Sequence, residues 1–224
     1  MALNVIMLGP PGAGKGTQAE RLALEYGVPK ISTGDILREA VQAGTEIGRL
    51  VRETMDAGHL VSDEMIIAIV RERLARADTA PGFVLDGFPR TVRQAQELDV
   101  MMVGRGPLAV LHLVVPTDQL VRRLSSRRIC ATCGHNAPPM APDDARCATC
   151  GGGLVHRSDD GDEVVRERLR VFDEQTRPLL AHYGSRPTFF AIDGNQPPDR
   201  VAAAMREMVE RLAGAKVPRA GGTA

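Results

Sequence analysis

The stretch GPPGAGKGT, from Gly9 to Thr17, constrains the fold more than any other part of the chain. It follows a short apolar run at residues 4–8 and precedes a segment in which apolar residues recur at helical spacing. Glycines between a strand and a helix let backbone N–H groups converge on a phosphate, at the positive end of the helix dipole. Lys15 adds a mobile charge, although only three of the 28 basic residues are lysines. We therefore predict a polyphosphate-binding loop, with a purely structural glycine turn as the alternative.

The residue after the lysine is Gly16, and the first hydroxyl comes one place later, at Thr17. In a P-loop the residue after the lysine is Ser or Thr, whose hydroxyl ligates Mg²⁺. Whether Thr17 ligates Mg²⁺ directly therefore stays open. The predicted phosphate-binding residues are Gly12, Ala13, Gly14, Lys15, Gly16 and Thr17.

Short apolar runs bounded by turn signals recur along the chain, separated by segments of helical period. The runs lie at residues 4–8, 30–32, 83–86, 110–115 and 188–193. Continuous apolar strands that alternate with helices are typical of a parallel sheet covered on both faces. The sequence predicts an α/β fold with a doubly wound, five-stranded parallel sheet.

The composition is that of an ordinary globular protein. The chain has 224 residues, 43% of them hydrophobic, and a formal net charge of zero. A neutral total disfavours bulk electrostatic binding to nucleic acid or to an anionic membrane. No apolar run approaches the roughly 20 residues that a bilayer span needs, and the N-terminal segment lacks the pattern of a signal peptide. We expect a cytoplasmic protein with no membrane or nucleic-acid partner.

Two segments interrupt the strand and helix pattern. Residues 32–61 have a helical pattern punctuated by glycines, and residues 126–160 contain all four cysteines. We expect both to be insertions that cover a site at the sheet. The expected core consists of residues 1–31, 62–125 and 161–212, followed by a small polar tail at 213–224 that we expect to be disordered.

The cysteines form two CATC motifs with 13 residues between them. Two C-x₂-C pairs, each followed by glycine, are typical of a structural tetrathiolate zinc site. Such a site has no open coordination position, so the metal would brace the segment and would not act on a substrate. Disulfides are the alternative, disfavoured in a cytoplasmic protein. The predicted zinc ligands are Cys130, Cys133, Cys147 and Cys150.

The motif GKGT is joined by STGDILR (32–38), LDGFPRT (85–91) and RSDD (157–160). With these motifs the chain resembles the adenylate kinases, in their long-lid form with a zinc knuckle, from about residue 3 to residue 212. The resemblance implies reversible phosphoryl transfer in which MgATP and AMP give two ADP. It also implies that residues 32–61 form the domain that binds the nucleoside monophosphate and that residues 126–160 form a zinc-binding lid. We expect a monomer.

The resemblance also implies roles for individual residues. Arg38 and Arg90 match the arginines that hold the AMP phosphate, and Asp86 matches the carboxylate that orders Mg²⁺. Lys15 and four further arginines gather over the ATP phosphates and the transferred group: Arg123, Arg127, Arg157 and Arg168. The AMP pocket is completed by Thr33, Leu60, Val61, Gly87 and Gln94, with Arg157 and Arg168 nearby.

Arginine suits this chemistry because its planar fork grips phosphate oxygens in pairs. The acceptor is a phosphate oxygen, which is largely ionised near neutral pH, so no general base is needed. Arg123 and Arg127 share one face if the helix expected from Thr117 extends that far. Arg168 lies on the inward stripe of its expected helix, with Val165 and Phe172.

Three points stay open. Gln94 either recognises the adenine edge or caps a helix, because Thr91-x-x-Gln94 is also a capping box. Asp159 and Asp160 either fix lid arginines or cap the following helix. Similar lids carry an aromatic residue beside the ATP adenine, where this chain has Asn136 and Ala137, so its selectivity for the donor base is in doubt.

Two rival functions remain. A kinase of UMP or CMP is disfavoured by Thr33, Gln94 and the long lid. A nucleotide-responsive module that binds nucleic acid through its zinc knuckle is disfavoured by the zero net charge. Aromatic residues make up only 3% of the chain, with no tryptophan, so stacking platforms for bases are scarce.

Overall fold

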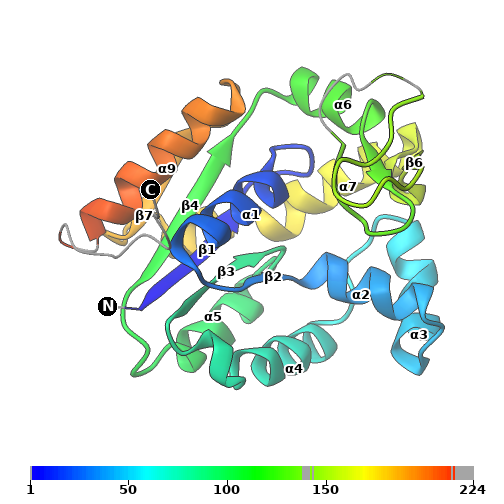
Figure 1. Cartoon of the computed structure of the whole chain (residues 1–224). Coiled ribbons are helices and arrows are strands. Elements are labelled where there is room, and N and C mark those ends of the chain that lie inside the picture. The colour runs from blue at the N-terminus through cyan, green and yellow to red at the C-terminus, as the bar shows by residue number, and fades with distance from the viewer. Residues whose placement is uncertain (1, 138–141, 143, 213, 215–224) are drawn as a thin grey trace.

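The computed structural model of the chain describes residues 2–137, 142, 144–212 and 214. The expected disordered tail at 213–224 lies outside the described residues, apart from Gly214. The described chain is an α/β structure in which helices surround a central sheet (Figure 1).

The central sheet has five parallel strands in the order β2-β3-β1-β4-β7. Their bounds are β1 Leu3–Leu8, β2 Lys30–Ser32, β3 Gly82–Asp86, β4 Leu108–Val114 and β7 Phe189–Asp193. Every predicted strand is present, with ends shifted by at most two residues. The predicted doubly wound sheet of five parallel strands is confirmed.

The helices connect these strands and cover both faces of the sheet (Figure 1). The α-helices are α1 Lys15–Tyr26, α2 Thr33–Gln42, α3 Glu46–Asp56, α4 Asp63–Leu74, α5 Val92–Met101, α6 Thr117–Ser125, α7 Asp162–Val171, α8 Leu179–Tyr183 and α9 Pro198–Leu212. Shorter turns are η1 Ala77–Thr79, η2 Ser158–Asp160 and the π-helical η3 Phe172–Thr176.

The alternation of side chains along the buried strands creates two cores. In β1, Val5 and Met7 point to one face, where they pack with residues of α1 and α9 such as Leu22 and Met205. The intervening β1 side chains, with Ile6 among them, belong to the opposite face and pack with α4, α5 and α8. Both faces are apolar, which explains why the strands are continuous apolar runs.

The strand register places the ends of β1 and β3 side by side. Met7 of β1 pairs with Asp86, the last residue of β3. Ser32, at the end of β2, also pairs with Asp86. The chain therefore leaves three neighbouring strands at the same end of the sheet, the carboxyl end. Open α/β sheets form their binding crevice there.

The two interrupting segments have local structure of their own. Residues 32–61 contain α2 and α3, joined at Gly44, whose φ of 63° is favourable for glycine. The cysteine-containing segment has a small antiparallel pair, β5 Arg128–Cys130 and β6 Leu154–His156. Figure 1 shows both segments on the same side of the molecule, beside α7.

One helix is shorter than its pattern suggested. α6 ends at Ser125, and Ser126 is its C-cap, so Arg127 lies outside the helix. Arg123 and Arg127 therefore do not share a helix face.

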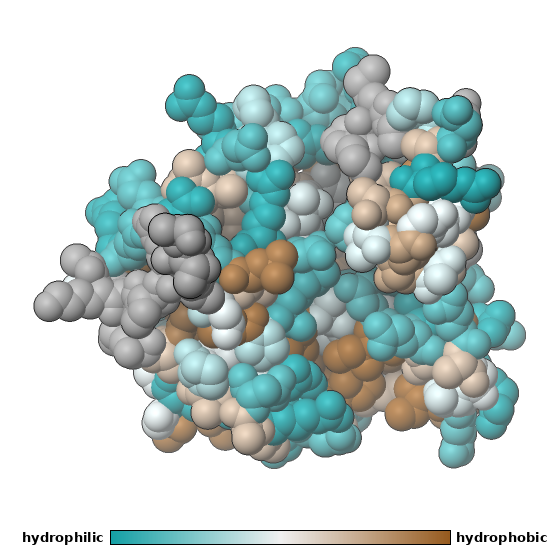
Figure 2. All heavy atoms as spheres, viewed as in Figure 1, coloured by the Kyte–Doolittle hydropathy of each residue, from teal (hydrophilic) through white to brown (hydrophobic). Residues whose placement is uncertain are grey.

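On the side seen in Figure 2 the surface is mostly hydrophilic, with a few separate hydrophobic areas. No helix among the described residues is both long enough and apolar enough to cross a membrane.

Candidate active site

The glycine-rich loop joins β1 to α1 at the carboxyl edge of the sheet. Gly12 and Gly14 have φ values of 82° and 90°, which L side chains rarely adopt. A Cβ on Gly12 would also lie 3.0 Å from the carbonyl oxygen of Leu120. The loop thus ends at the first turn of α1, where free N–H groups and the helix dipole favour an anion.

Lys15 is the first residue of α1, and its ammonium lies back over the loop. Its Nζ donates hydrogen bonds to the carbonyl oxygens of Gly9 at 2.8 Å and Pro10 at 2.9 Å. Burial lowers the pKa of Lys15 to about 8, against the effect of the nearby Asp86 carboxylate. The Lys15 ammonium is therefore held in the loop by backbone carbonyl groups. An anion that binds there would stabilise the charged form of the lysine.

Asp86 lies beside the loop. A Cβ placed on Gly16 would be 3.2 Å from Asp86 Oδ2, so a side chain at position 16 would crowd the carboxylate. This contact gives a reason for glycine after Lys15. The position of Asp86 beside Lys15 suits a carboxylate that orders a cation at the phosphates.

A second group forms around Gly87. Thr33 Oγ1 and Arg90 Nε each donate a hydrogen bond to the Gly87 carbonyl oxygen at 2.9 Å. Arg38 projects from α2 and forms an ion pair with Asp35. Burial lowers the pKa of Arg90, and the charges of Asp86, Arg38 and Arg157 also act on it, so these groups lie near one another.

A third group binds the cysteine-containing segment to α7. Asp160, with a side chain only 2% exposed, accepts two hydrogen bonds from Arg127 at 2.6 and 2.7 Å and one from Arg168 at 2.8 Å. Asp159 accepts two from Arg157, at 2.6 and 2.8 Å. Burial alone would raise the pKa of Asp159, but the charges of Arg157 and Arg168 outweigh it and lower the pKa to about 2.

These contacts answer one open question. α7 begins after Gly161, and neither aspartate side chain caps it. Asp159 and Asp160 instead bind Arg127, Arg157 and Arg168, which fixes the arginine side chains in place.

The three groups converge on one place. The charges of Arg90, Arg127 and Arg168 all act on Lys15, and that of Arg157 acts on Arg90. Six cationic side chains thus meet four carboxylates, Asp35, Asp86, Asp159 and Asp160, which leaves a surplus of positive charge. The six are Lys15, Arg38, Arg90, Arg127, Arg157 and Arg168. Such a surplus at the carboxyl edge of the sheet suits a polyanion.

Arg123 is positioned differently. Its Nη1 donates to the carbonyl oxygen of Gly194, in the loop after β7, at 3.0 Å. This contact lies on the other side of β4 from the Gly87 group, because β7 follows β4 in the sheet. In this structure the contacts of Arg123 thus differ from those of the other predicted arginines.

Gln94 is buried, with 1% exposure, next to the Gly87 group. Its side-chain Oε1 accepts from the backbone N–H of Arg90 at 2.7 Å, and its Nε2 donates to Asp63 Oδ1 at 2.7 Å. Thr91 is the N-cap of α5, and its Oγ1 accepts from the Gln94 backbone N–H. The capping box is therefore half formed, because the Gln94 side chain bonds to Arg90 and not to Thr91.

The remaining predicted residues lie around these groups. Val61 is buried in the core, and Leu60 is half-buried. Thr17 is exposed at the first turn of α1. Asn136 and Ala137 pair with the β5 segment: Asn136 bridges to Ile129, and the Ala137 N–H donates to the Arg128 carbonyl oxygen at 2.9 Å.

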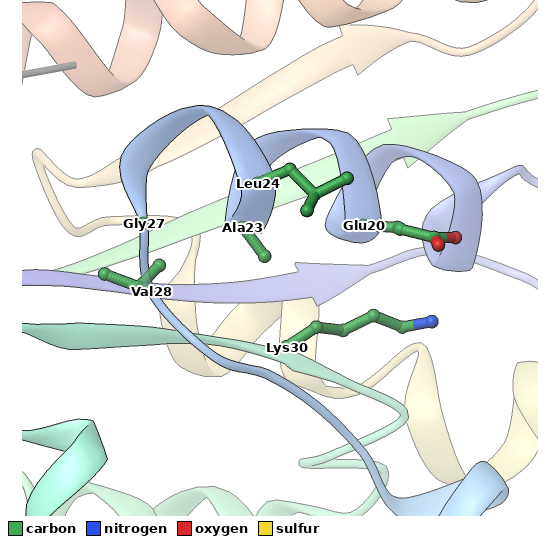
Figure 3. Close-up of a pocket in the computed structure, with 6 residues that line it drawn as sticks. All are labelled: Glu20, Ala23, Leu24, Gly27, Val28 and Lys30. Carbon is green, nitrogen blue, oxygen red and sulfur yellow. The ribbon is translucent and has the colours of Figure 1, made fainter. Parts of the chain in front are cut away.

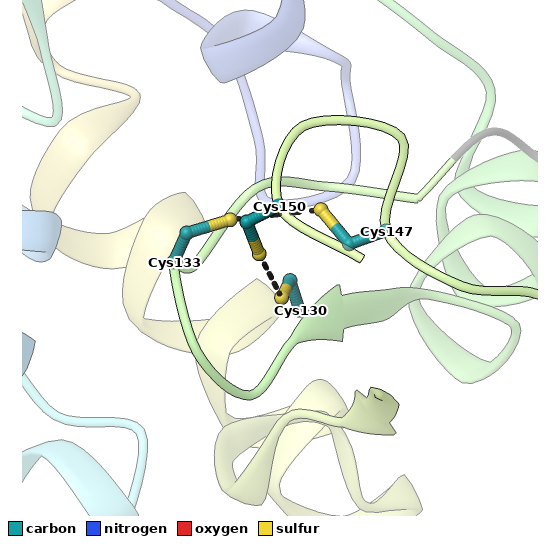
Figure 4. Close-up of side chains that lie close together, drawn as sticks. All are labelled: Cys130, Cys133, Cys147 and Cys150. Carbon is teal, nitrogen blue, oxygen red and sulfur yellow. Dashed lines mark hydrogen bonds between the residues drawn. The ribbon is translucent and has the colours of Figure 1, made fainter. Parts of the chain in front are cut away.

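The four cysteines form one cluster (Figure 4), in which all four Sγ atoms lie within 4.8 Å of one another. Cys130 Sγ is 3.4 Å from Cys150 Sγ, and Cys133 Sγ is 3.6 Å from Cys147 Sγ. Four sulfurs about 2.3 Å from a tetrahedral Zn²⁺ would be about 3.8 Å apart, so the cluster fits this ion closely.

The two cysteine turns have the same geometry. The backbone N–H groups of Thr132 and Thr149 each donate to the sulfur of the preceding knuckle cysteine, at 3.4 Å. The glycines that follow the two motifs, Gly134 and Gly151, have φ values of 70° and 72°. N–H groups aimed at sulfur stabilise thiolates, which is the form that binds a metal.

A surface pocket of about 380 Å³ lies between α1 and the segment that leads into β2 (Figure 3). Its described lining residues are Glu20, Ala23, Leu24, Gly27, Val28 and Lys30, none of which belongs to the predicted phosphate site. In Figure 3 the side chains of Glu20 and Lys30 come from α1 and β2 on either side of the pocket.

Sequence patterns missed two acidic residues of the site. Asp35 holds Arg38 and also lies 3.5 Å from Lys30 Nζ. Asp63 holds Gln94 and Thr91, which are about 30 residues further along the chain. Each is an acid in the first turn of a helix, a common position that gives no sign of a distant partner.

A P-loop at the carboxyl edge of a doubly wound parallel sheet, facing a cluster of arginines, defines the class of P-loop phosphotransferases. Comparison with known proteins narrows this class. The model of the adenylate kinase family matches residues 7–188, which is most of the chain. The chain therefore belongs to the adenylate kinase family.

Curated relatives agree with this assignment over nearly the whole chain. The adenylate kinase of Archaeoglobus fulgidus is 46% identical over 217 residues, which cover 94% of this chain and 99% of the relative. That of Kosmotoga olearia is 46% identical over 94% of this chain and 100% of its own length. That of Acidothermus cellulolyticus is 50% identical over 90% of this chain and 95% of its own.

Proposed function

We propose that the chain transfers the γ-phosphoryl group of MgATP reversibly to AMP and so forms two ADP. The observation that carries this proposal is the convergence of Arg90, Arg127 and Arg168 on Lys15, in a member of the adenylate kinase family. Phosphoryl transfer depends mostly on positioning and on stabilising charge spread over the phosphate oxygens. A cluster of fixed cations supplies both.

The cationic side chains divide into three sets. The loop from Gly12 to Thr17, with Lys15, holds the donor phosphates. Arg38 and Arg90, which lie near each other and near Asp86, hold the phosphate of AMP. Arg127, Arg157 and Arg168 stabilise the group in transit, and a single transition-state arginine can contribute 10³–10⁵ in rate.

Mg²⁺ bound to the donor phosphates would neutralise charge on their oxygens. Asp86 is the residue that would order this ion, and since Mg²⁺ keeps most of its waters, the carboxylate acts through them. The Asp86 side chain lies beside Gly16 and acts on both Lys15 and Arg90. It would therefore hold a hydrated cation at the donor phosphates.

Residues 32–61 would bind AMP, and residues 126–160 would close over ATP as a lid around a structural Zn²⁺. Closure excludes water, which would otherwise hydrolyse the donor. Asn136 and Ala137 offer no aromatic ring to the donor base, so GTP and other donors should be accepted more readily than in lids that have one.

The proposed form of the protein is a monomer. Four free thiols in one cluster are suited to a reducing compartment, in keeping with a cytoplasmic location.

The direct test is to incubate the purified protein with MgATP and, separately, AMP, CMP, UMP, GMP or water, and to quantify every nucleotide by chromatography. The expected result is two ADP for each ATP consumed with AMP alone. Equal use of UMP or CMP would identify a different monophosphate kinase. Hydrolysis of ATP without an acceptor, or no reaction, would refute the proposal.

Gln94 is proposed to recognise adenine. Gln94→Ala should raise the KM for AMP roughly tenfold or more, the value of a buried hydrogen-bonded pair, and leave that for ATP within about twofold. Steady-state kinetics with each nucleotide varied in turn measures both constants. Equal increases for AMP and ATP would instead assign Gln94 to capping α5.

A further inference from the structure

The side chain of Gln94 has hydrogen-bonding partners that fix which end of its amide faces which way. A glutamine amide carries two N–H donors on nitrogen and two acceptor sites on oxygen. The two ends are nearly isosteric, so a change of orientation costs only what the partners impose. Asp63 Oδ1 can only accept, and it faces Gln94 Nε2 at 2.7 Å. The Arg90 N–H can only donate, and it faces Gln94 Oε1 at 2.7 Å.

Asp63 itself is held in one orientation. It is the first residue of α4, and its other oxygen, Oδ2, accepts a hydrogen bond of 2.9 Å from Thr91 Oγ1. Thr91 Oγ1 in turn accepts from the Gln94 backbone N–H, so the single hydroxyl hydrogen of Thr91 is free to bond to Asp63. Both oxygens of Asp63 are thus committed to the start of α5.

Gln94 is 1% exposed, so water offers it few alternative partners. Reversing its amide would place Oε1 against the Asp63 carboxylate and Nε2 against the Arg90 N–H. Both contacts would then pair like with like. The described residues give the amide no further hydrogen-bond partner, so one N–H and one acceptor site are left, in a fixed arrangement, for a base that reaches this buried side chain.

The edge of adenine offers an N6–H donor beside the N1 acceptor. Hypoxanthine has the reverse pattern, O6 as acceptor and N1–H as donor. An amide locked in one orientation matches one of these edges and opposes the other. We propose that Asp63 is a positioning residue that selects the acceptor base by fixing the amide of Gln94, an inference that rests on the proposed function.

The test compares AMP with IMP as acceptor, because the two differ only at position 6 and at the N1 proton. Asp63→Asn keeps the shape of the side chain, but its amide can either accept or donate. Reversal of Gln94 then meets one unfavourable contact in place of two. The ratio of kcat/KM for AMP over IMP should fall at least about tenfold, as expected when the penalty of one like-with-like contact to a charged group is removed.

Glu64→Gln is the matched control. Glu64 is the next residue of the same helical turn and pairs with Arg93 of α5, so it links the same two helices without contacting Gln94. Its AMP-to-IMP ratio should equal that of the parent protein. Melting temperatures of both variants report any loss of stability. If Asp63→Asn does not fold, Asp63→Ser, which keeps a residue favourable at a helix start, takes its place.

The outcomes separate the two proposals. Failure of the parent protein to convert AMP to ADP refutes the proposed function before any variant is tested. If the parent uses AMP, and Asp63→Asn leaves the ratio of kcat/KM for AMP over IMP unchanged, then Asp63 only supports the helices. Its role in selecting the base is then refuted.

Discussion

At the scale of single residues, the site is defined by charges whose states depend on their neighbours. Lys15 is held against the carbonyl oxygens of Gly9 and Pro10, and burial lowers its pKa to about 8. Arg157, by contrast, is paired with Asp159. The protonation of Lys15 can therefore change near pH 8.

The first prediction concerns this lysine. A polyphosphate favours its charged form and so raises its pKa. At pH 8, where the free protein holds Lys15 partly neutral, binding of MgATP should therefore take up about half a proton. Titration calorimetry in two buffers of different ionisation enthalpy measures this uptake. Lys15→Arg, which is charged throughout, should show none; equal uptake by both proteins would assign the proton to another group.

At the scale of secondary-structure elements, short local patterns and long-range contacts have different roles. The two CATC turns repeat one geometry, because each places a glycine of positive φ after its second cysteine. Gly152 is also confined, since a Cβ there would lie 2.8 Å from Cys130 Sγ. Each turn is formed by residues close together in the chain. The cluster of four sulfurs brings the two turns together.

Removal of the proposed zinc ion should destabilise the proposed lid without abolishing the chemistry at once. A chelator, with metal loss confirmed by elemental analysis, should lower the melting temperature by at least about 5 °C, because metal binding contributes folding free energy. Part of the activity should survive at low temperature, and Cys147→Ser should behave alike. Immediate, complete inactivation with no loss of stability would mean that the metal acts on the substrate.

At the scale of the whole molecule, residues 32–61 and α7 approach each other closely. His59 Nε2 lies 3.0 Å from Glu167 Oε1 on α7. A Cβ on the neighbouring Gly58 would lie 2.9 Å from Arg168 Cγ and 3.2 Å from the Val164 carbonyl oxygen, so the Gly58 backbone packs closely against α7. Arg38, from residues 32–61, and Arg157 both lie close enough to Arg90 for their charges to act on it.

The contact of His59 should favour the arrangement that binds AMP. His59→Ala should raise the KM for AMP by roughly twofold to fivefold, the value of an exposed polar contact, with a smaller effect on kcat. Glu174→Gln is the control, because Glu174 pairs with Arg170 on the same stretch of chain. Steady-state kinetics at low salt measures the KM for AMP and the kcat of each variant. Equal increases of the KM for AMP in the two variants would exclude a specific role for His59.

The sequence by itself determined the local parts of this protein: the phosphate loop, the five strands and the cysteine turns. Each depends on residues close together in the chain, through positive φ at glycine, through alternation of apolar side chains, or through a two-residue spacer between thiols. It also carried the family motifs. It did not determine the end of α6, where the chain leaves the helix at Ser125 although its pattern could continue.

Only the tertiary structure decided which side chains meet. Asp160 binds Arg127 from 33 residues away, and Asp63 binds Gln94 from 31 residues away. Arg123 has the same residue type and a similar context as Arg127, yet its contact is with Gly194. Such pairings arise when packed helices bring distant side chains within about 3 Å. Any arginine can bond to any carboxylate, so no pattern in the sequence specifies the partner.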